Sequence, residues 1–144
     1  MSAESGEKTP LRYGDVELGD DLPDHCPDVS LATVRTFAEA TRMMAPRFID
    51  HEGARKEGLP GAIVPGIMSQ AVLAAIIHRW SPGCTIRRID TIFRAPLLVD
   101  TTPVCRGVVT DTDDATHSVE IDLTIVNEAD ETRVIGTAQV ELKV

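Results

Sequence analysis

The sequence has few aromatic residues, few cysteines and no long apolar segment. Aromatic side chains make up 3% of the 144 residues and apolar residues 42%, so the core must be built from aliphatic side chains. No segment approaches the roughly 18 consecutive apolar residues of a membrane-spanning helix. The N-terminus, MSAESGEKTP, is polar and lacks the apolar core of a secretory signal. We therefore expect no membrane association, and we expect residues 1–10 to form a disordered tail.

The chain also lacks an excess of basic residues. Its net charge is −9, which argues against nucleic acid or an anionic membrane surface as a partner. Cys26, Cys84 and Cys105 are odd in number and form no CxxC pair, which is typical of free thiols in the reduced cytoplasm. His25 and Cys26 are ligand-type residues, but no second cluster completes a metal shell. We expect no metal site.

Two helices are predicted in the first half of the chain. Residues 30–42 carry apolar side chains at helical spacing, and Ser30 is suited to cap the helix start. Pro46 prevents a smooth continuation of that helix. Residues 67–80 are apolar around nearly the whole helical circumference, which indicates a buried helix. A short strand followed by a loop is expected within residues 13–24, and one helical turn near 51–58.

The second half reads as four strands, over residues 84–96, 101–112, 117–127 and 132–144. The third is the clearest, because apolar residues alternate with polar ones from Val119 to Ile125. The short segments DTDDAT and NEADE predict hairpins between the last three strands. The pattern predicts an α+β domain over residues 11–144, with a curved antiparallel sheet wrapped around one buried central helix. Such a layer leaves an edge and part of a face for a second, homologous copy to cover.

The loop between the two helices has a distinctive spacing of prolines and glycines. Gly58 falls eight residues after Asp50, and the glycines that follow precede the buried helix. With the strand order, this loop resembles the hot-dog fold of the MaoC-like (R)-specific enoyl-CoA hydratases and dehydratases. Their signature runs D-x-N-P-x-H-x-D, then a glycine eight residues on, then G-G-x-I-x-H-G-M. The matching positions are Pro46, Asp50, Gly58, Gly61, Ile63 and Gly66. FRAP (93–96) and residues 127–142 are also similar to the later strands of the family.

The reactive positions of that signature are occupied by apolar residues. The catalytic aspartate corresponds to Met43 and the catalytic histidine to Phe48, while Ala45 and Pro65 replace the asparagine and the second histidine. In the family the Asp–His pair activates the water that adds to the double bond, and such work needs a proton acceptor. The resemblance therefore implies no catalytic residue in this chain. The apolar replacements either build a wall for a large acyl group or plug a redundant site.

Among the groups of the signature that act on the substrate, the backbone N–H of Gly66 is retained. The resemblance implies that this N–H binds a thioester carbonyl, helped by the partial positive charge of a helix N-terminus. The alternative is that Gly66 only reflects a crowded entry to the helix. The expected substrate-binding residues are Gly66, Pro65, Ile67, Met43 and Phe48.

Other polar residues have two interpretations each. Asp50 and His51 are fallback candidates for a relocated dyad, or a solvated loop in which Asp50 caps the following turn. Arg87, Arg88 and Arg94 either meet a coenzyme A phosphate or balance nearby carboxylates.

Two further histidines are assigned structural roles. His78, late in the buried helix, is expected to be structural, and His117 to be exposed at the start of a strand.

The leading hypothesis is a non-catalytic subunit of a heteromeric enoyl-CoA hydratase or dehydratase. Its partner would be a hot-dog chain that keeps the Asp and His, and the substrate a bulky steroid side-chain or long-chain acyl-CoA, with no resident cofactor. Two alternatives stay open. One is a self-sufficient hydratase or thioesterase, a homodimer that uses Asp50, His51 or Glu52. The other is an acyl- or lipid-binding protein without turnover.

Overall fold

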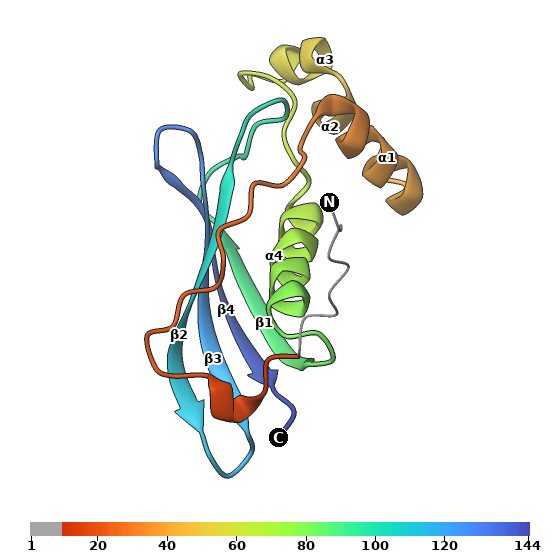
Figure 1. Ribbon diagram of the computed structural model, residues 1–144. Coiled ribbons are helices and arrows are strands. Elements are labelled where there is room, and N and C mark those ends of the chain that lie inside the picture. The colour runs from red at the N-terminus through yellow and green to blue at the C-terminus, as the bar shows by residue number, and fades with distance from the viewer. Residues whose placement is uncertain (1–9) are drawn as a thin grey trace, which may run out of the picture.

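The computed structural model describes residues 10–144, and the tail expected at residues 1–10 lies, apart from Pro10, outside that range. One sheet carries a long helix on one face, and shorter helices gather beyond one end of it (Figure 1). No helix between residues 10 and 144 is both long and apolar enough to cross a membrane. The elements are the 3-10 helix η1 (Tyr13–Asp15), the helices α1 (Leu31–Thr41), α2 (Pro46–Ile49), α3 (His51–Lys56) and α4 (Gly66–Trp80), and the strands β1 (Thr85–Phe93), β2 (Val104–Asp113), β3 (Ser118–Val126) and β4 (Thr132–Glu141).

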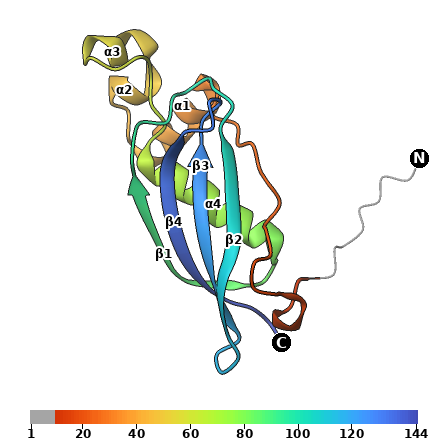
Figure 2. The same ribbon diagram turned by 90° about the vertical axis from the view of Figure 1, so that its left-hand side faces the viewer.

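The sheet has four antiparallel strands in the order β1-β4-β3-β2. The hairpins predicted between the last three strands are confirmed, because β3 pairs with both β2 and β4 (Figure 2). The alternation in β3 is confirmed as well: Ile121 and Leu123 are buried while Glu120 and Asp122 are exposed. The predicted α+β class, with a curved antiparallel sheet and one central helix, is therefore correct.

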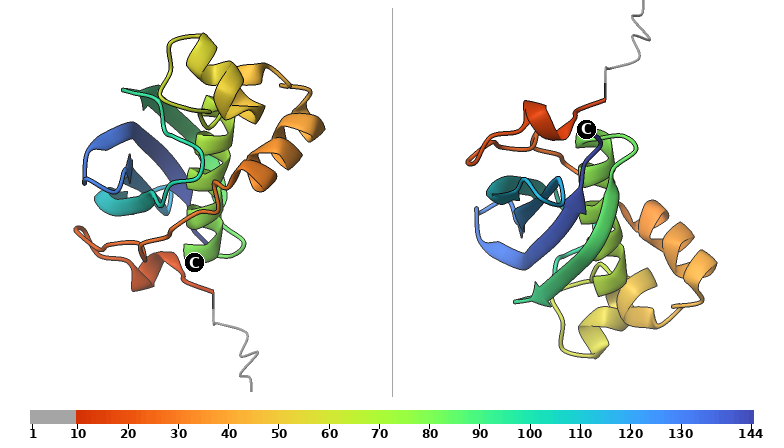
Figure 3. Two further views of the ribbon diagram at one scale, coloured as in Figure 1. Left: turned by 90° about the horizontal axis from the view of Figure 1, so that it is seen from above. Right: turned by 90° about the horizontal axis from the view of Figure 1, so that it is seen from below.

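Helix α4 packs against one face of the sheet, which curls around it (Figure 3). Leu73 and Ile77 have no exposed surface and belong to the same apolar core as Ile121 and Leu123 of β3. The expectation that α4 buries its whole circumference is wrong, however, because Ile67 is 54% exposed. Four strands cover only one side of a helix, so the apolar residues on the opposite side remain at the surface.

The short strand expected within residues 13–24 does not form. Its place is taken by η1 and an extended segment that pairs with β2 at two isolated bridges, Asp21 with Val108 and His25 with Cys105. Gly19 has a φ of 90° and interrupts a regular ladder. The segment nevertheless covers the β2 edge of the sheet, which leaves β1 as the open edge.

The corner between α1 and α4 is built from two short helices, where only one turn was expected. Ser30 caps α1 as predicted, by accepting a hydrogen bond from the Thr33 N–H at 3.3 Å. Pro46 starts α2, since its missing N–H costs nothing at the first helical position. Helix α3 crosses α2 closely: a Cβ on Gly53 would lie 2.7 Å from Cβ of Pro46.

We predict that Gly53→Ala destabilises the protein, because the proline ring cannot move away from the added methyl group. The expected loss is about 1–3 kcal/mol of unfolding free energy, typical of overpacking, measured by urea denaturation. Gly14→Ala is the matched control, since a Cβ there meets nothing within 4 Å. Equal stability of Gly53→Ala and the parent protein would show that the α2–α3 corner is not tightly packed.

Candidate functional site

A hollow of about 430 Å³ lies where the α1–α4 corner meets the start of α4 and the end of β1. We call it the Gly66 hollow. It brings together Phe48 and Gly66, two of the residues that the sequence singled out, although they are separated by the whole of α3. Its lining residues are Arg47, Phe48, Ile63, Val64, Gly66, Ser69, Phe93, Arg94, Ala95, Pro96, Leu97 and Val134.

Gly66 opens α4 and is packed against an aromatic ring. A Cβ at this position would lie 3.0 Å from two ring carbons of Phe93, so the absence of a side chain allows the close contact. Pro65 is buried and provides no side-chain cap. Among residues 10–144, no group accepts a hydrogen bond from the Gly66 or Ile67 N–H. The helix start therefore presents free N–H groups with partial positive charge beside an apolar hollow.

The remaining expected substrate-binding residues lie elsewhere. Ile67 is next to Gly66 but on the exposed side of α4, outside the hollow lining. Met43 follows the end of α1, where its N–H donates to the Ala38 carbonyl at 2.8 Å, and it does not line the hollow. Ala45 precedes α2 as its N-cap residue. The apolar character of the hollow thus comes from Phe48, Ile63 and Val64 of the loop and from residues beyond it, Phe93 among them.

The sequence reasoning did not single out Phe93. The available signal was composition: Phe93 is one of three phenylalanines in the chain, and it ends a strand directly before Arg94. Its contact with Gly66 joins residues 27 positions apart in the printed sequence, which no local pattern reveals.

His51 is held by hydrogen bonds on both ring nitrogens. Its Nδ1 accepts from the Ala62 N–H at 3.0 Å, so the ring proton sits on Nε2 and is donated to Asp100, 2.7 Å away. Asp100 also accepts from the Leu31 N–H at 2.8 Å. The pair joins α3, the start of α1 and the β1–β2 connection. Neither ring nitrogen is left free to accept a proton from a substrate.

Asp50 caps α3, which agrees with the interpretation of this residue as a cap rather than as part of a dyad. Its carboxylate accepts from the Glu52 N–H at 3.1 Å, and it does not line the Gly66 hollow. Asp50 and His51 are neighbours in sequence but serve different contacts. The structure does not bring them together as a dyad.

The arginines divide into two groups. Arg87 pairs with Glu141 and Arg88 with Asp90, each at 2.6 Å, so both balance carboxylates. Arg94 lines the Gly66 hollow, and no carboxylate between residues 10 and 144 forms an ion pair with it. Arg47, also in the lining, lies 3.4 Å from Glu57. The hollow is therefore apolar with a cationic rim.

The other candidate residues have local roles. His78 is on the exposed side of α4, with Nδ1 3.7 Å from Sγ of Cys84. His117 was expected to be exposed at a strand start; instead it is a half-buried turn residue with φ of 52°, packed edge-on against Tyr13. Burial raises the pKa of the Cys105 thiol to about 12. No group of three or more metal-ligating side chains forms within residues 10–144.

Comparison with known proteins identifies the fold. No family model and no curated protein matches the chain. In contrast, 142 chains of solved structures match it, and MaoC-like dehydratases are among them. The (R)-hydratase from A. caviae involved in PHA biosynthesis superposes with a TM-score of 0.83 at 19% identity, covering 88% of this chain and 97% of that one.

Two other similar structures are complexes from Mycobacterium tuberculosis. A chain of the ChsH1-ChsH2 complex superposes with a TM-score of 0.81 at 19% identity, covering 88% of this chain and 98% of that one. A chain of the HadBC (3R-hydroxyacyl-ACP dehydratase) complex superposes with a TM-score of 0.70 at 16% identity, covering 85% of this chain and 96% of that one. The chain has the hot-dog fold that it shares with the (R)-hydratases and MaoC-like dehydratases, so the resemblance inferred from the loop is confirmed at the level of fold.

We predict that the His51–Asp100 contact makes stability depend on pH. The hydrogen bond from His51, and then that from the Leu31 N–H, lower the pKa of Asp100. Because the pKa of Asp100 is lower in the folded state, its ionised form stabilises the protein at pH values above the unfolded-state pKa of aspartate, about 4. This stabilisation is lost as the pH falls through the pKa of Asp100 in the folded state. Asp100→Asn should therefore melt below the parent protein at neutral pH, and the difference should shrink under acid.

Thermal melts at stepped pH test this prediction. Asparagine tolerates the φ of 62° at this position, so the substitution adds no backbone strain. Asp122→Asn, on the exposed face of β3, is the control. A melting difference between Asp100→Asn and the parent that stays constant from neutral to acid pH would contradict the assignment.

Proposed function

We propose that the chain is a non-catalytic subunit of a MaoC-like enoyl thioester hydratase or dehydratase. One observation carries this proposal: none of the residues that line the Gly66 hollow is Asp, Glu, His, Cys, Lys or Tyr. Water addition next to a thioester needs a side chain that accepts and returns a proton near neutral pH. The hollow offers arginines, one serine and apolar groups, which do not serve as that base. The chemistry is therefore assigned to a partner that keeps the Asp–His pair.

The open edge of the sheet supports a partner of the same fold. The segment before α1 covers the β2 edge through its bridges, whereas β1 has a paired neighbour on one side only. Ile92 is 64% and Phe93 52% exposed on this strand, and Phe93 packs against Gly66 at the start of α4. An unpaired strand with apolar neighbours is suited to bind a second strand. Similar structures from ChsH1-ChsH2 and HadBC are themselves complexes.

The hollow also supports an acyl thioester as the substrate of the assembly. Phe48 and Phe93 offer apolar surface to a bulky acyl group, such as a steroid side chain or a long chain. Arg47 and Arg94 at the rim are suited to a coenzyme A phosphate, which matters in a chain of net charge −9. The thioester is a substrate, and the proposal includes no resident cofactor. The free thiols of Cys26, Cys84 and Cys105 suit a cytoplasmic location, which is part of the proposal.

A second candidate is an acyl- or lipid-binding protein without turnover. The observation in its favour is the apolar lining of a hollow whose volume falls within the usual range for small-molecule sites, about 300–1,000 Å³. Native mass spectrometry of the chain purified without a partner distinguishes the candidates. A bound acyl ligand in stoichiometric amount favours the binding protein.

We expect the chain to lack hydratase activity alone and to support it in a complex. The test is to purify the tagged chain from its own host, identify the bound proteins by mass spectrometry, and assay water addition to an enoyl-CoA. A stoichiometric hot-dog partner that carries the D-x-N-P-x-H loop is the expected result. Recovery of this chain alone, with turnover, would overturn the proposal.

Asp50→Asn in the complex provides a sharper test of the catalytic assignment. Asparagine also caps helices, so the α3 start is retained. Because Asp50 is outside the hollow, we expect kcat and KM of the complex to stay unchanged. A large loss of kcat would instead assign the base to this chain and favour the self-sufficient enzyme.

We predict that Ile92→Lys weakens partner binding. A charged side chain on an open strand edge opposes pairing with a second strand, so the partner should dissociate at concentrations where the parent complex persists. Size-exclusion chromatography with light scattering measures the change. Leu18→Lys is the matched control, since Leu18 is 67% exposed and precedes the segment that covers the opposite edge. Equal complex stability in both variants would remove β1 as the interface.

A further inference from the structure

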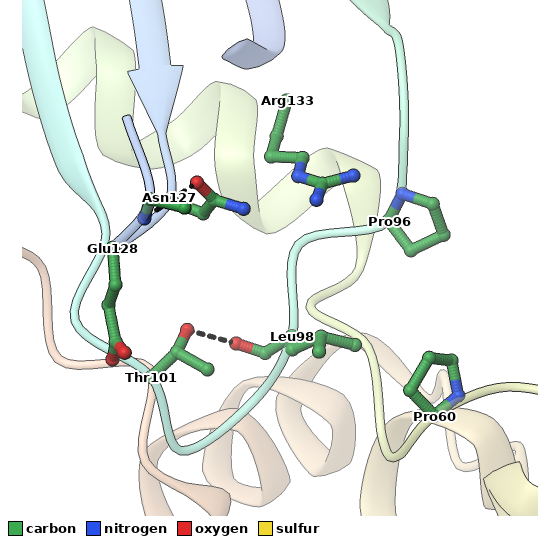
Figure 4. A pocket seen from close by; sticks show the side chains of 8 residues that line it. Pro60, Pro96, Leu98, Thr101, Asn127, Glu128 and Arg133 are labelled. Atoms are coloured by element: carbon green, nitrogen blue, oxygen red, sulfur yellow. Dashed lines mark hydrogen bonds between the residues drawn. The ribbon is translucent and has the colours of Figure 1, made fainter. Parts of the chain in front are cut away.

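A second hollow lies beside the Gly66 hollow and shares Pro96 with it. Its volume is about 350 Å³, which is enough for a small organic molecule. We call it the hairpin hollow, because it lies between the β3–β4 hairpin and the β1–β2 connection (Figure 4). Its lining residues are Pro60, Pro96, Leu98, Thr101, Asn127, Glu128, Ala129 and Arg133.

Apolar groups form half of this lining, and one cation faces them. Pro60, Pro96, Leu98 and Ala129 provide the apolar surface. Arg133 extends from β4, on the side of the hollow opposite to Leu98 (Figure 4). Any ligand that fills the space therefore contacts apolar groups over most of its surface and meets one guanidinium.

Arg133 has hydrogen-bond donors to spare. Its side chain is only 27% exposed, and Nη2 donates to Glu131 at 3.2 Å. Among residues 10–144, no acceptor is bonded to its Nε or Nη1. A guanidinium has five N–H donors in a fixed plane, so Arg133 can bind an acceptor on a ligand without giving up its carboxylate.

Two carboxylates make an anionic ligand unfavourable. Glu128 accepts hydrogen bonds from the Thr102 N–H and hydroxyl, both at 2.9 Å, and these bonds lower its pKa. Glu131 accepts from Asn127 and from Arg133, and both contacts lower its pKa. Glu128 lines the hollow and Glu131 pairs with Arg133, so the region holds two carboxylates and one guanidinium. A ligand carboxylate or phosphate would add a third negative charge.

We propose that the hairpin hollow binds a neutral, mostly apolar molecule that carries one carbonyl oxygen, which accepts a hydrogen bond from Arg133. The apolar lining buries the hydrocarbon body, and a hydrogen bond from a charged donor fixes the orientation. The site adjoins the Gly66 hollow at Pro96 but has otherwise different lining residues, and the proposal does not depend on the catalytic role of the assembly.

A matched pair of probes tests the ligand class. The full chain, labelled with nitrogen-15, is titrated with 2-octanone and with octanoate while backbone amide signals are followed by NMR. We expect 2-octanone to shift the amide signals of Thr101 and Ala129 in a saturable manner. Octanoate should bind about tenfold more weakly, because its carboxylate brings a further negative charge to a hollow that already holds Glu128 and adjoins Glu131. Tighter binding of octanoate, or no shift with either probe at millimolar concentration, overturns the proposal.

Three variants locate the site. Ala129→Leu adds volume from an exposed turn residue and should abolish saturable binding without unfolding the protein. Arg133→Met keeps an apolar stem but no donor, and should weaken 2-octanone binding about tenfold. Arg94→Met, which removes a cation from the Gly66 hollow only, is the control and should have no effect. Shifts confined to Phe48 and Gly66, or unchanged binding by Ala129→Leu, would place the ligand elsewhere.

Discussion

The architecture depends on the burial of helix α4, and its own sheet supplies that burial on one side only. Leu73 and Ile77 reach the core of the four strands, where each fully buried aliphatic side chain contributes about 1.5–3 kcal/mol. On the opposite side of the helix Ile67 remains at the surface, and on β1 Ile92 and Phe93 are exposed as well. The side of α4 that faces the sheet therefore forms the core of the protein. The side that the sheet leaves uncovered belongs to the surface on which a partner is expected.

The same helix determines the candidate site, because its N-terminus opens into the Gly66 hollow. Phe93 approaches Gly66 so closely that a Cβ would lie 3.0 Å from the ring, and this packing alone explains the glycine. The free N–H groups of the helix start are a separate property of the same residues. The close contact supports the second of the two explanations for Gly66, a crowded entry to the helix. Binding of a thioester carbonyl by the free backbone N–H stays a prediction, and the two roles are compatible because one uses the missing side chain and the other the backbone.

The local sequence pattern was sufficient to predict those elements whose conformation depends on residues close by in the sequence. The alternation in β3 and the Ser30 cap of α1 have this character, and both were predicted. The strand expected within residues 13–24 was wrong, because Gly19 adopts a positive φ and the segment pairs with β2 only at isolated bridges. Contacts between distant residues left no local signal. His51 and Asp100 are 49 positions apart, and only the folded chain brings the ring and carboxylate together.

Of the positions at which the sequence resemblance expects a reactive residue, Phe48 is one that lines the Gly66 hollow. A buried acid–base pair costs desolvation free energy, about 1–3 kcal/mol for each polar group without a full set of partners. Phe48 carries no such cost, and its ring adds apolar contact in the hollow. The only Asp–His pair between residues 10 and 144 is that of His51 and Asp100, where it joins three elements rather than facing the hollow. In this chain the polar residues of the loop maintain the fold, and the hollow is left to apolar contact and a cationic rim. That division of roles is expected of a subunit that shapes a site whose proton transfers belong to its partner.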